Sequence, residues 1–330
     1  MGKAAWMYYD VHGILTAKTN VPVLNDFFRV PRLRREPDLT VFMGEFRPWE
    51  PGEDGLRLVY RARGILRSEV LIEGLASGRT RVLISNPYFR LFGRVSRRVR
   101  KLIRAIYYLM LLMKGYALLH SACVEKDGKG ILLTAPPETG KTFTAIRLVR
   151  DHGFKLLGDD MVIIGPGPRA LASPGTMTLH PIHVRTYKLK LGPKRELEMA
   201  LRHALRRLPY VVMFVKEFKM RVDEVLGPGK VSKEARITKL FFLEEGREAV
   251  RPVGPEEAFR RLMAVGRMHH CVYENEVIQE YAYRNPELDL EGLFERLRSL
   301  CWSLVEDVDC WLVRCRGKRF ADLMLREGLL

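Results

Sequence analysis

The sequence predicts an α/β protein in which a small β-rich domain precedes a larger core of strands and helices. Within the first 92 residues, short apolar runs are separated by glycine, proline and aspartate, a pattern typical of consecutive strands and turns. From residue 115 onward, apolar strand-like runs alternate with segments of helical periodicity. A length of 330 residues and a hydrophobic content of 47% are sufficient for two cores, so we expect two domains.

The β-rich N-terminal domain is expected over residues 1–92, with strands at 39–43, 56–60, 70–72 and 81–84. A connecting amphipathic helix is expected over 93–114. Its apolar stripe consists of Val95, Val99, Leu102, Ile106, Leu109 and Met113 at helical spacing. Beyond it, the periodicity predicts strands at 120–125, 131–134, 154–157, 161–164, 237–243 and 310–314, and helices at 142–151, 194–207, 255–265, 288–305 and 320–327.

The connecting helix and the segment before it are rich in cations. They carry Arg90, Arg94, Arg97, Arg98, Arg100, Lys101 and Arg104 without an acidic residue among them. The formal net charge of the chain is +17, which favours anionic partners such as nucleotides, phosphorylated metabolites, nucleic acid or an anionic membrane. A solvated basic face on a core-packing helix is the favoured interpretation of this segment, and a nucleic-acid or lipid surface stays open.

The cysteines and the hydropathy of the sequence indicate in which cellular compartment the protein is expected. The five cysteines are an odd number without the spacing of a disulfide framework, which is typical of reduced thiols in a cytoplasmic protein. The N-terminus has no apolar region of the signal-peptide kind. The longest apolar run, 105–113, is about half as long as a bilayer span requires, so no transmembrane segment is expected.

The segment Ala135-Pro-Pro-Glu-Thr-Gly-Lys-Thr142 nearly completes the phosphate-binding pattern G-x-x-x-x-G-K-[ST], with alanine in place of the first glycine. It lies between a predicted strand and a predicted helix, as the motif requires. The backbone N–H groups of 139–142 can hold a phosphate at the positive end of the helix. In such a loop Lys141 reaches the β- and γ-phosphates and the Thr142 hydroxyl binds Mg²⁺. The expected nucleotide-binding residues are Ala135, Glu138, Thr139, Gly140, Lys141 and Thr142.

Two further features accompany this loop. The pair Asp159-Asp160 separates two predicted strands, and ligands of open α/β sheets bind where strands meet their loops. His120 stands at the start of another predicted strand. Alone, a histidine is more often a structural residue and an Asp-Asp pair a solvated turn. Together with the loop they indicate a functional site.

These residues resemble the HPr kinase/phosphorylase family of P-loop kinases, which is akin in structure to phosphoenolpyruvate carboxykinase. The separations, 21 residues from His120 to Lys141 and 18 from Lys141 to Asp159, are similar to those of the family. The resemblance implies a P-loop catalytic domain of the HPr kinase/carboxykinase type over 115–330. It makes Asp159 the acid/base residue, Lys141 a catalytic and nucleotide-binding group, and His120 a neighbour of the transferred phosphate. Thr142 and Asp160 would hold Mg²⁺, and hexamers or other homo-oligomers are a family expectation.

The stretch 174–185 departs from that family. The HPr-specific enzymes carry a second signature there with an acidic metal ligand, whereas this stretch has no acidic residue. We therefore expect neither phosphorylation of HPr nor phosphorolysis of its phosphoserine form. The acceptor, a protein serine or a small metabolite, is expected near 174–185 and a loop at 216–233. Arg185, Lys216, Lys219 and Arg221 are the candidate cations for an anionic acceptor.

The favoured function is an ATP-dependent kinase that uses ATP and Mg²⁺ and transfers a γ-phosphoryl group to a hydroxyl. A nucleotide-binding regulator without transfer activity is the alternative, supported by the irregular loop and the absence of the second acidic ligand. A carboxykinase is a weaker possibility, because the chain is much shorter than such enzymes and an additional metal-binding set is not recognisable.

Overall fold

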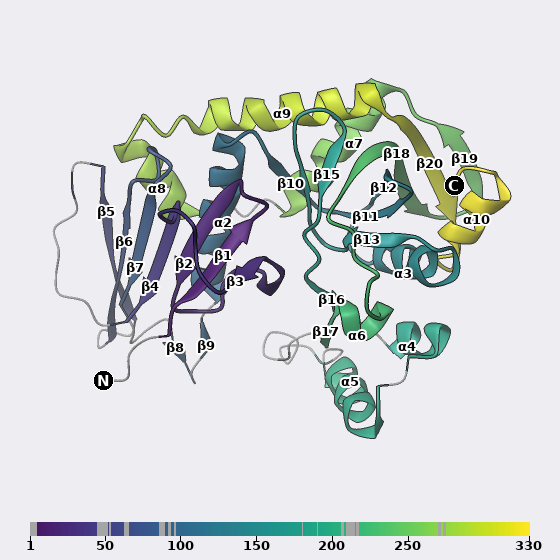
Figure 1. Ribbon diagram of the computed structural model, residues 1–330, viewed down its shortest axis with the longest axis horizontal. Coiled ribbons are helices and arrows are strands. Elements are labelled where there is room, and N and C mark those ends of the chain that lie inside the picture. Colours follow the sequence, from purple (N-terminus) through teal and green to yellow (C-terminus); the bar gives the residue numbers. More distant parts are fainter. Residues whose placement is uncertain are drawn as a thin grey trace. The chain divides into compact units, whose positions relative to one another are not determined.

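The computed structural model describes residues 5–44, 52, 54–62, 66–85, 90–91, 94–95, 97–179, 181–189, 191–205, 208, 215, 218–269, 272 and 275–330. The chain divides into two compact units. The first consists of Met1–Leu118 and Gly266–Leu300, and the second of Leu119–Val265 and Cys301–Leu330. Both combine strands with helices (Figure 1), which confirms the mixed α/β class predicted from the sequence.

The first unit is built on a seven-stranded sheet in the order β3-β1-β2-β4-β7-β6-β5. Its strands are β1 (Met7–Val11), β2 (Leu15–Thr19), β3 (Arg29–Val30), β4 (Leu39–Met43), β5 (Leu56–Ala62), β6 (Leu66–Glu73) and β7 (Thr80–Ile84), with a 3-10 helix η1 (Asp26–Phe28) before β3. Alternate residues of β4 and β7 are buried, as expected for a sheet with one covered face. Two short strands follow, β8 (Arg90–Leu91) and β9 (Arg94–Val95).

Helix α2 (Arg97–Met113) is the connecting helix expected over 93–114, and it belongs to the first unit. Its start differs from the expectation because residues 94–95 form β9. The Thr80 hydroxyl lies 3.5 Å from the Met110 sulfur, so α2 packs on the sheet. The cations Arg98, Arg100, Lys101 and Arg104 are exposed, whereas every residue from 105 to 112 is buried.

The division into units differs from the expected domains 1–92, 93–114 and 115–330, because residues 266–300 return to the first unit. Helix α8 (Glu276–Arg284) contacts α2 and β5. Tyr281 of α8 is fully buried, and its hydroxyl accepts a hydrogen bond of 3.1 Å from the Leu75 N–H. Sequence periodicity shows which face of a helix is apolar but not which distant segment covers that face, so this return could not be predicted.

The second unit is built on a nine-stranded sheet. Its main path is β10-β14-β15-β18-β12-β11-β13, and β20 pairs with β18 and β19. The strands are β10 (Ala117–Leu119), β11 (Ser121–Lys126), β12 (Lys129–Thr134), β13 (Lys155–Gly158), β14 (Val162–Ile164), β15 (Arg169–Leu171), β18 (Glu234–Glu245), β19 (Ala249–Pro252) and β20 (Asp309–Cys315). β12, β18 and β20 are mutually parallel, whereas β11 is antiparallel to both β12 and β13.

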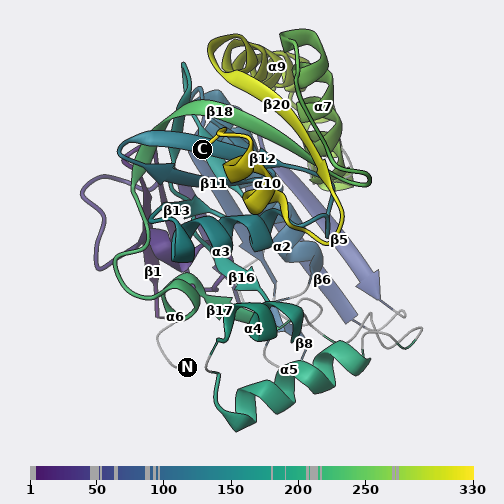
Figure 2. The same ribbon diagram turned by 90° about the vertical axis from the view of Figure 1, so that its right-hand side faces the viewer.

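Helices cover both faces of this sheet (Figure 2). On one face lie α3 (Lys141–Asp151) and α10 (Phe320–Arg326), and on the other lie α7 (Pro255–His269) and the end of α9 (Leu290–Asp307). Phe241 of β18 belongs to the core under α3, while the next residue, Phe242, lies below the guanidinium of Arg261 on α7. This alternation is the period of two expected for a strand buried on both sides.

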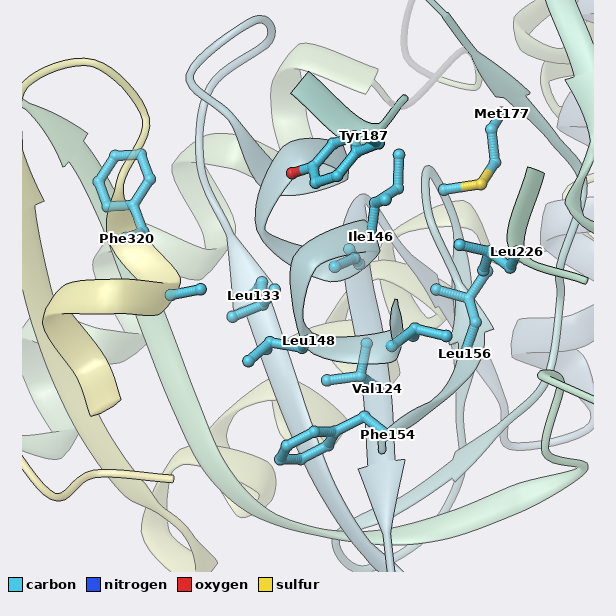
Figure 3. Packing of buried hydrophobic residues seen from close by; sticks show 14 of the residues in the cluster. Val124, Leu133, Ile146, Leu148, Phe154, Leu156, Met177, Tyr187, Leu226 and Phe320 are labelled. Carbon is cyan, nitrogen blue, oxygen red and sulfur yellow. The ribbon is translucent and has the colours of Figure 1, made fainter. Parts of the chain in front are cut away.

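The core beneath α3 fixes the helix that follows the loop 135–142. Ile146 and Leu148 of α3 pack with Val124, Leu133 and Leu156 of the sheet (Figure 3). All five side chains are fully buried. Burying an aliphatic side chain of this size contributes about 1.5–3 kcal/mol to stability, so the position of α3 on the sheet is strongly determined.

The remaining elements lie between β15 and β18 in the sequence. They are β16 (Thr176–Thr178), α4 (Pro181–Tyr187), α5 (Pro193–Leu205), β17 (Lys219–Arg221) and α6 (Val222–Leu226). The expected loop over 216–233 is therefore wrong in part, because it contains β17 and α6. Val222 and Val225 anchor the segment by packing into the core. The expectation of a loop was based on the glycines and lysines of this segment, which do not indicate such packing. Within the described residues, no helix is long and apolar enough to span a membrane.

Candidate functional site

The predicted site residues come from three strand ends at one edge of the second unit's sheet. β12 ends at Thr134, β11 begins at Ser121, and β13 ends at Gly158. Ser121 is paired with Thr134, and Cys123 with Gly158. Because β11 is antiparallel to both neighbours, its start meets their ends. His120, the loop after Thr134 and the pair Asp159-Asp160 therefore lie along the same edge.

The loop 135–142 uses two residues with left-handed backbone conformations. Glu138 has φ +64° and Gly140 has φ +130°, whereas Ala135 is not among the positive-φ residues. A missing glycine at 135 is thus compatible with this backbone. Gly140 also lies close to a neighbouring turn, because a Cβ atom added to it would be 3.3 Å from the side chains of Lys318 and Phe320. The loop therefore tolerates alanine at its start and requires glycine at 140.

Lys141 is the first residue of α3, and its side chain is folded back over the loop. It is only 7% exposed. Its Nζ donates hydrogen bonds to the carbonyl oxygens of Ala135 at 2.7 Å and of Pro136 at 3.2 Å. Burial lowers the pKa of Lys141 to about 8, although Asp160 and Asp159 oppose the shift. The ammonium is therefore held at the start of the helix, where the first N–H groups lack intrahelical acceptors.

Asp159 lies directly beside this helix start. The Thr142 hydroxyl donates a hydrogen bond of 3.0 Å to Oδ2 of Asp159. Asp159 is 3% exposed, and no protein donor among the described residues reaches its Oδ1. Burial, together with the charge of Asp160, raises the pKa of Asp159 to about 7 despite the opposing effects of Thr142, Lys141 and Lys219. A buried carboxyl group with one oxygen open is suited to binding a cation or to exchanging a proton.

The raised pKa of Asp159 predicts a pH-dependent stability. Between pH 4 and pH 7 the native protein holds a proton that the unfolded chain releases, because the pKa of Asp159 is about 7 in the folded state and 3.8 ordinarily. The free energy of unfolding contributed by this group therefore falls as pH rises through that window. We expect Asp159→Asn to remove this loss, so that the melting temperature of the variant rises relative to that of the parent from pH 4 to pH 7 and the difference levels off at higher pH. A gap that stays constant across this range would contradict the assignment.

The helix start is held from outside by α4. The Tyr187 hydroxyl donates a hydrogen bond of 2.5 Å to the carbonyl of Phe143, and the two rings lie 4.9 Å apart. Arg150 donates to the Tyr187 carbonyl at 2.6 Å. These contacts fix the first turn of α3 next to Lys141 and Thr142.

The other predicted site residues have different surroundings. His120 is buried, while Asp160 is exposed. The hydroxyl of Thr142 bonds to Asp159 and not to Asp160, the residue expected to share a metal with it. A Mg²⁺ ion bound to nucleotide phosphates needs only one or two protein oxygens, so the Thr142 hydroxyl and a neighbouring carboxylate fit such an ion. No group of three or more histidine, cysteine or acidic side chains suited to a metal occurs among the described residues.

The candidate acceptor-binding cations that the structure describes come from two elements, Arg185 from α4 and Lys219 and Arg221 from β17. Lys219 and Arg221 lie on the exposed face of β17, since Met220 between them is buried. The charge of Lys219 lowers the pKa of Asp159, which places it within electrostatic reach of the site. Arg221 instead forms an ion pair of 3.1 Å with Asp223. Arg185 is exposed on α4, and Lys216 lies outside the described residues.

One part of the site was missed by sequence reasoning. The turn Arg316-Gly-Lys-Arg319 between β20 and α10 approaches Gly140. Its three cations around a glycine are visible in the sequence. However, nothing in a single sequence indicates that a turn 178 residues away in the chain lies against the loop.

No family model and no curated protein matches the chain. Among solved structures, the HPr(Ser) kinase/phosphatase from Coxiella burnetii is similar over 64% of this chain and 92% of its own, with 10% identity and a TM-score of 0.30. At these values the similarity carries no argument about function.

Proposed function

We propose that the second unit binds a nucleoside triphosphate with Mg²⁺ at the loop 135–142 and transfers the γ-phosphoryl group to a hydroxyl acceptor. The observation that carries this proposal is the hydrogen bond between Thr142 and Asp159 beside Lys141. In P-loop enzymes a hydroxyl at the helix start and an aspartate from a nearby strand lie on either side of the metal, and the lysine contacts the phosphates.

The side chains fit this ligand. Lys141 is already at the start of α3, where the positive end of the helix favours an anion, and phosphate oxygens can replace the two loop carbonyls as acceptors of its ammonium. Thr142 and Asp160 supply oxygen ligands of the type that Mg²⁺ prefers, with Asp159 beside them. When bound, Mg²⁺ would neutralise phosphate charge.

In the proposed reaction the acceptor oxygen attacks the γ-phosphorus, the bond to the β–γ bridging oxygen breaks, and the nucleoside diphosphate leaves. The acceptor proton passes to the carboxylate of Asp159. The hydrogen bond from Thr142 holds Oδ2, which leaves Oδ1 for the proton. A pKa of about 7 suits this role, because a general base works best when its pKa is near the operating pH. His120, buried at the same edge, is proposed to orient the site.

The same hydrogen bond also supports a second candidate function. If Asp159 serves only to position Thr142 and the metal, the protein is a nucleotide-binding regulator without transfer activity. The two functions are separated by incubating the protein with γ-labelled ATP and Mg²⁺ in the presence of metabolite and protein pools, followed by mass spectrometry. A labelled acceptor that disappears with Asp159→Asn supports the kinase. Nucleotide binding without any labelled product supports the regulator.

For the acceptor, Lys219 is the favoured anion-binding residue. The charge of Lys219 lowers the pKa of Asp159, and Arg221, on the same strand, forms an ion pair with Asp223. We expect Lys219→Gln to raise the acceptor KM by roughly tenfold with little change in nucleotide affinity, because lost ground-state anchoring appears mainly in KM. Arg221→Gln, on the same face of the same strand, is the matched control and should leave the acceptor KM nearly unchanged. Equal effects of the two changes would show that Lys219 has no special role. Arg185 and Lys216 remain proposed contacts.

A further inference from the structure

The turn between β20 and α10, Arg316–Arg319, lies against the loop that we propose to bind phosphate. A methyl group placed on Gly140 would lie 3.3 Å from both Cβ and Cγ of Lys318 and 3.3 Å from Cε2 of Phe320. These contacts are tighter than most, so a side chain at 140 would require Lys318 or Phe320 to shift, and the φ of +130° would strain it as well. The base of the Lys318 side chain therefore borders the residue that immediately precedes Lys141.

The turn is held in this position from both ends. On its C-terminal side Phe320 is fully buried and belongs to the same hydrophobic cluster as Ile146 and Leu148 of α3 (Figure 3). Asp322 of α10 forms an ion pair of 3.1 Å with Arg147 of α3. On its N-terminal side β20 is paired in parallel with β18 as far as Cys315. The turn is thus fixed to the same helix that begins at Lys141.

Among the residues that the structure describes, the three cations of the turn have no acidic partner. Within the described part of the chain, Arg316, Lys318 and Arg319 take part in no ion pair. Neighbouring arginines behave differently. Arg147 pairs with Asp151 and Asp322, and Arg314 pairs with Glu244. Arg326 pairs with Glu248 and Glu327. The turn that borders Gly140 therefore carries positive charge that no carboxylate of the described residues offsets.

The backbone of the turn is also unusual. Lys318 has φ +60°, a conformation that is unfavourable for a residue with a Cβ atom. Backbone outliers of this kind are concentrated at ligand-binding and catalytic sites. A glycine at position 318 would adopt this conformation without strain, yet the residue there, next to the start of α3, is a lysine.

We propose that the turn Arg316–Arg319 is a second phosphate-binding element, which contacts the phosphate chain of the bound nucleotide through Lys318 and Arg319. Arg316 contributes charge to the same surface. The inference deepens the proposed function and depends on it, since it assigns to the same nucleotide a second set of ligands from the far end of the chain. Arginine and lysine are the side chains that recognise phosphate through charge-assisted hydrogen bonds.

The test is calorimetric titration of the full-length chain with ADP and Mg²⁺ and, separately, with adenosine. The variant is Lys318→Gln combined with Arg319→Gln. The matched control is Lys129→Gln combined with Lys155→Gln, which removes the same charge from exposed residues at the opposite edge of the sheet. We expect the turn variant to bind ADP about 10- to 100-fold more weakly and to bind adenosine as the parent does. The control should stay within about twofold of the parent for ADP.

A single substitution distinguishes the loss of a phosphate contact from a loss of stability. Lys318→Gly removes the cation but also relieves the left-handed backbone, so we expect it to be at least as stable as the parent and still to bind ADP more weakly. ADP affinity in the turn variant equal to that of the control would overturn the inference and leave the proposed function intact. Failure of the parent to bind ADP or ATP would overturn both.

Discussion

Replacing Asp159 with asparagine is expected to lower phosphoryl transfer by about 10²- to 10⁴-fold while leaving the affinity for ATP and Mg²⁺ within a few-fold. The amide cannot accept the proton of the attacking hydroxyl. It can still accept the hydrogen bond from Thr142, which lies 3.0 Å from Oδ2, so the start of α3 should keep its geometry. The rate is measured as transfer of labelled phosphate to the identified acceptor, and the affinity by calorimetry.

The neighbouring residue provides the control for this change. Asp160 is exposed, and the structure gives its carboxylate no hydrogen bond to Thr142. We expect Asp160→Asn to raise the Mg²⁺ concentration needed for activity while retaining much of the maximal rate. Transfer by Asp159→Asn at the parental rate would exclude this residue as the base. An equal loss in both variants would indicate a shared role in metal binding instead.

Replacing Lys141 with alanine is expected to weaken the binding of ATP with Mg²⁺ by roughly 10- to 150-fold, the range of about 1.5–3 kcal/mol for a charge-assisted hydrogen bond. Lys141 is the cation within the loop 135–142. Its ammonium already lies within 3.2 Å of two loop carbonyls, so it needs little movement to reach a phosphate. Calorimetric titration of the variant and the parent measures the effect.

Lys141→Met tests whether charge or packing is responsible. The side chain is largely buried, so alanine leaves space beside the loop, whereas methionine fills most of it without a charge. Both variants should bind equally poorly if the phosphate contact matters. Binding that is restored by methionine would mean that Lys141 supports the loop and does not bind phosphate.

Local patterns in the sequence were sufficient to place many of the elements. The strand before the loop and the helix after it are β12 and α3, and the apolar run 237–243 lies within β18. β1 and β2 were not predicted, because a charged residue, Asp10 or Lys18, interrupts the apolar run of each strand. Short strands of this kind are stabilised by their neighbours in the sheet rather than by their own composition.

The arrangement of the site depends on information that a single sequence does not contain. Lys141 and Thr142 could be recognised from a motif. The meeting of His120, Thr134 and Gly158 at one edge depends on β11 being antiparallel to both of its neighbours, which is a property of strand order. Likewise, the approach of Lys318 to Gly140 depends on β20 lying beside β18, about a hundred positions or more from the loop in sequence.

A crystal structure of the protein with ADP and Mg²⁺ would show whether the loop 135–142 binds phosphate. We predict that the β-phosphate lies against the backbone N–H groups at the start of α3, and that the ammonium of Lys141 has moved from the carbonyls of Ala135 and Pro136 to the phosphate. The metal should lie next to Thr142 and the Asp159-Asp160 pair. A nucleotide bound elsewhere on the protein, or a Lys141 that keeps both carbonyl contacts with ADP bound, would contradict the assignment of the loop 135–142 as the phosphate site.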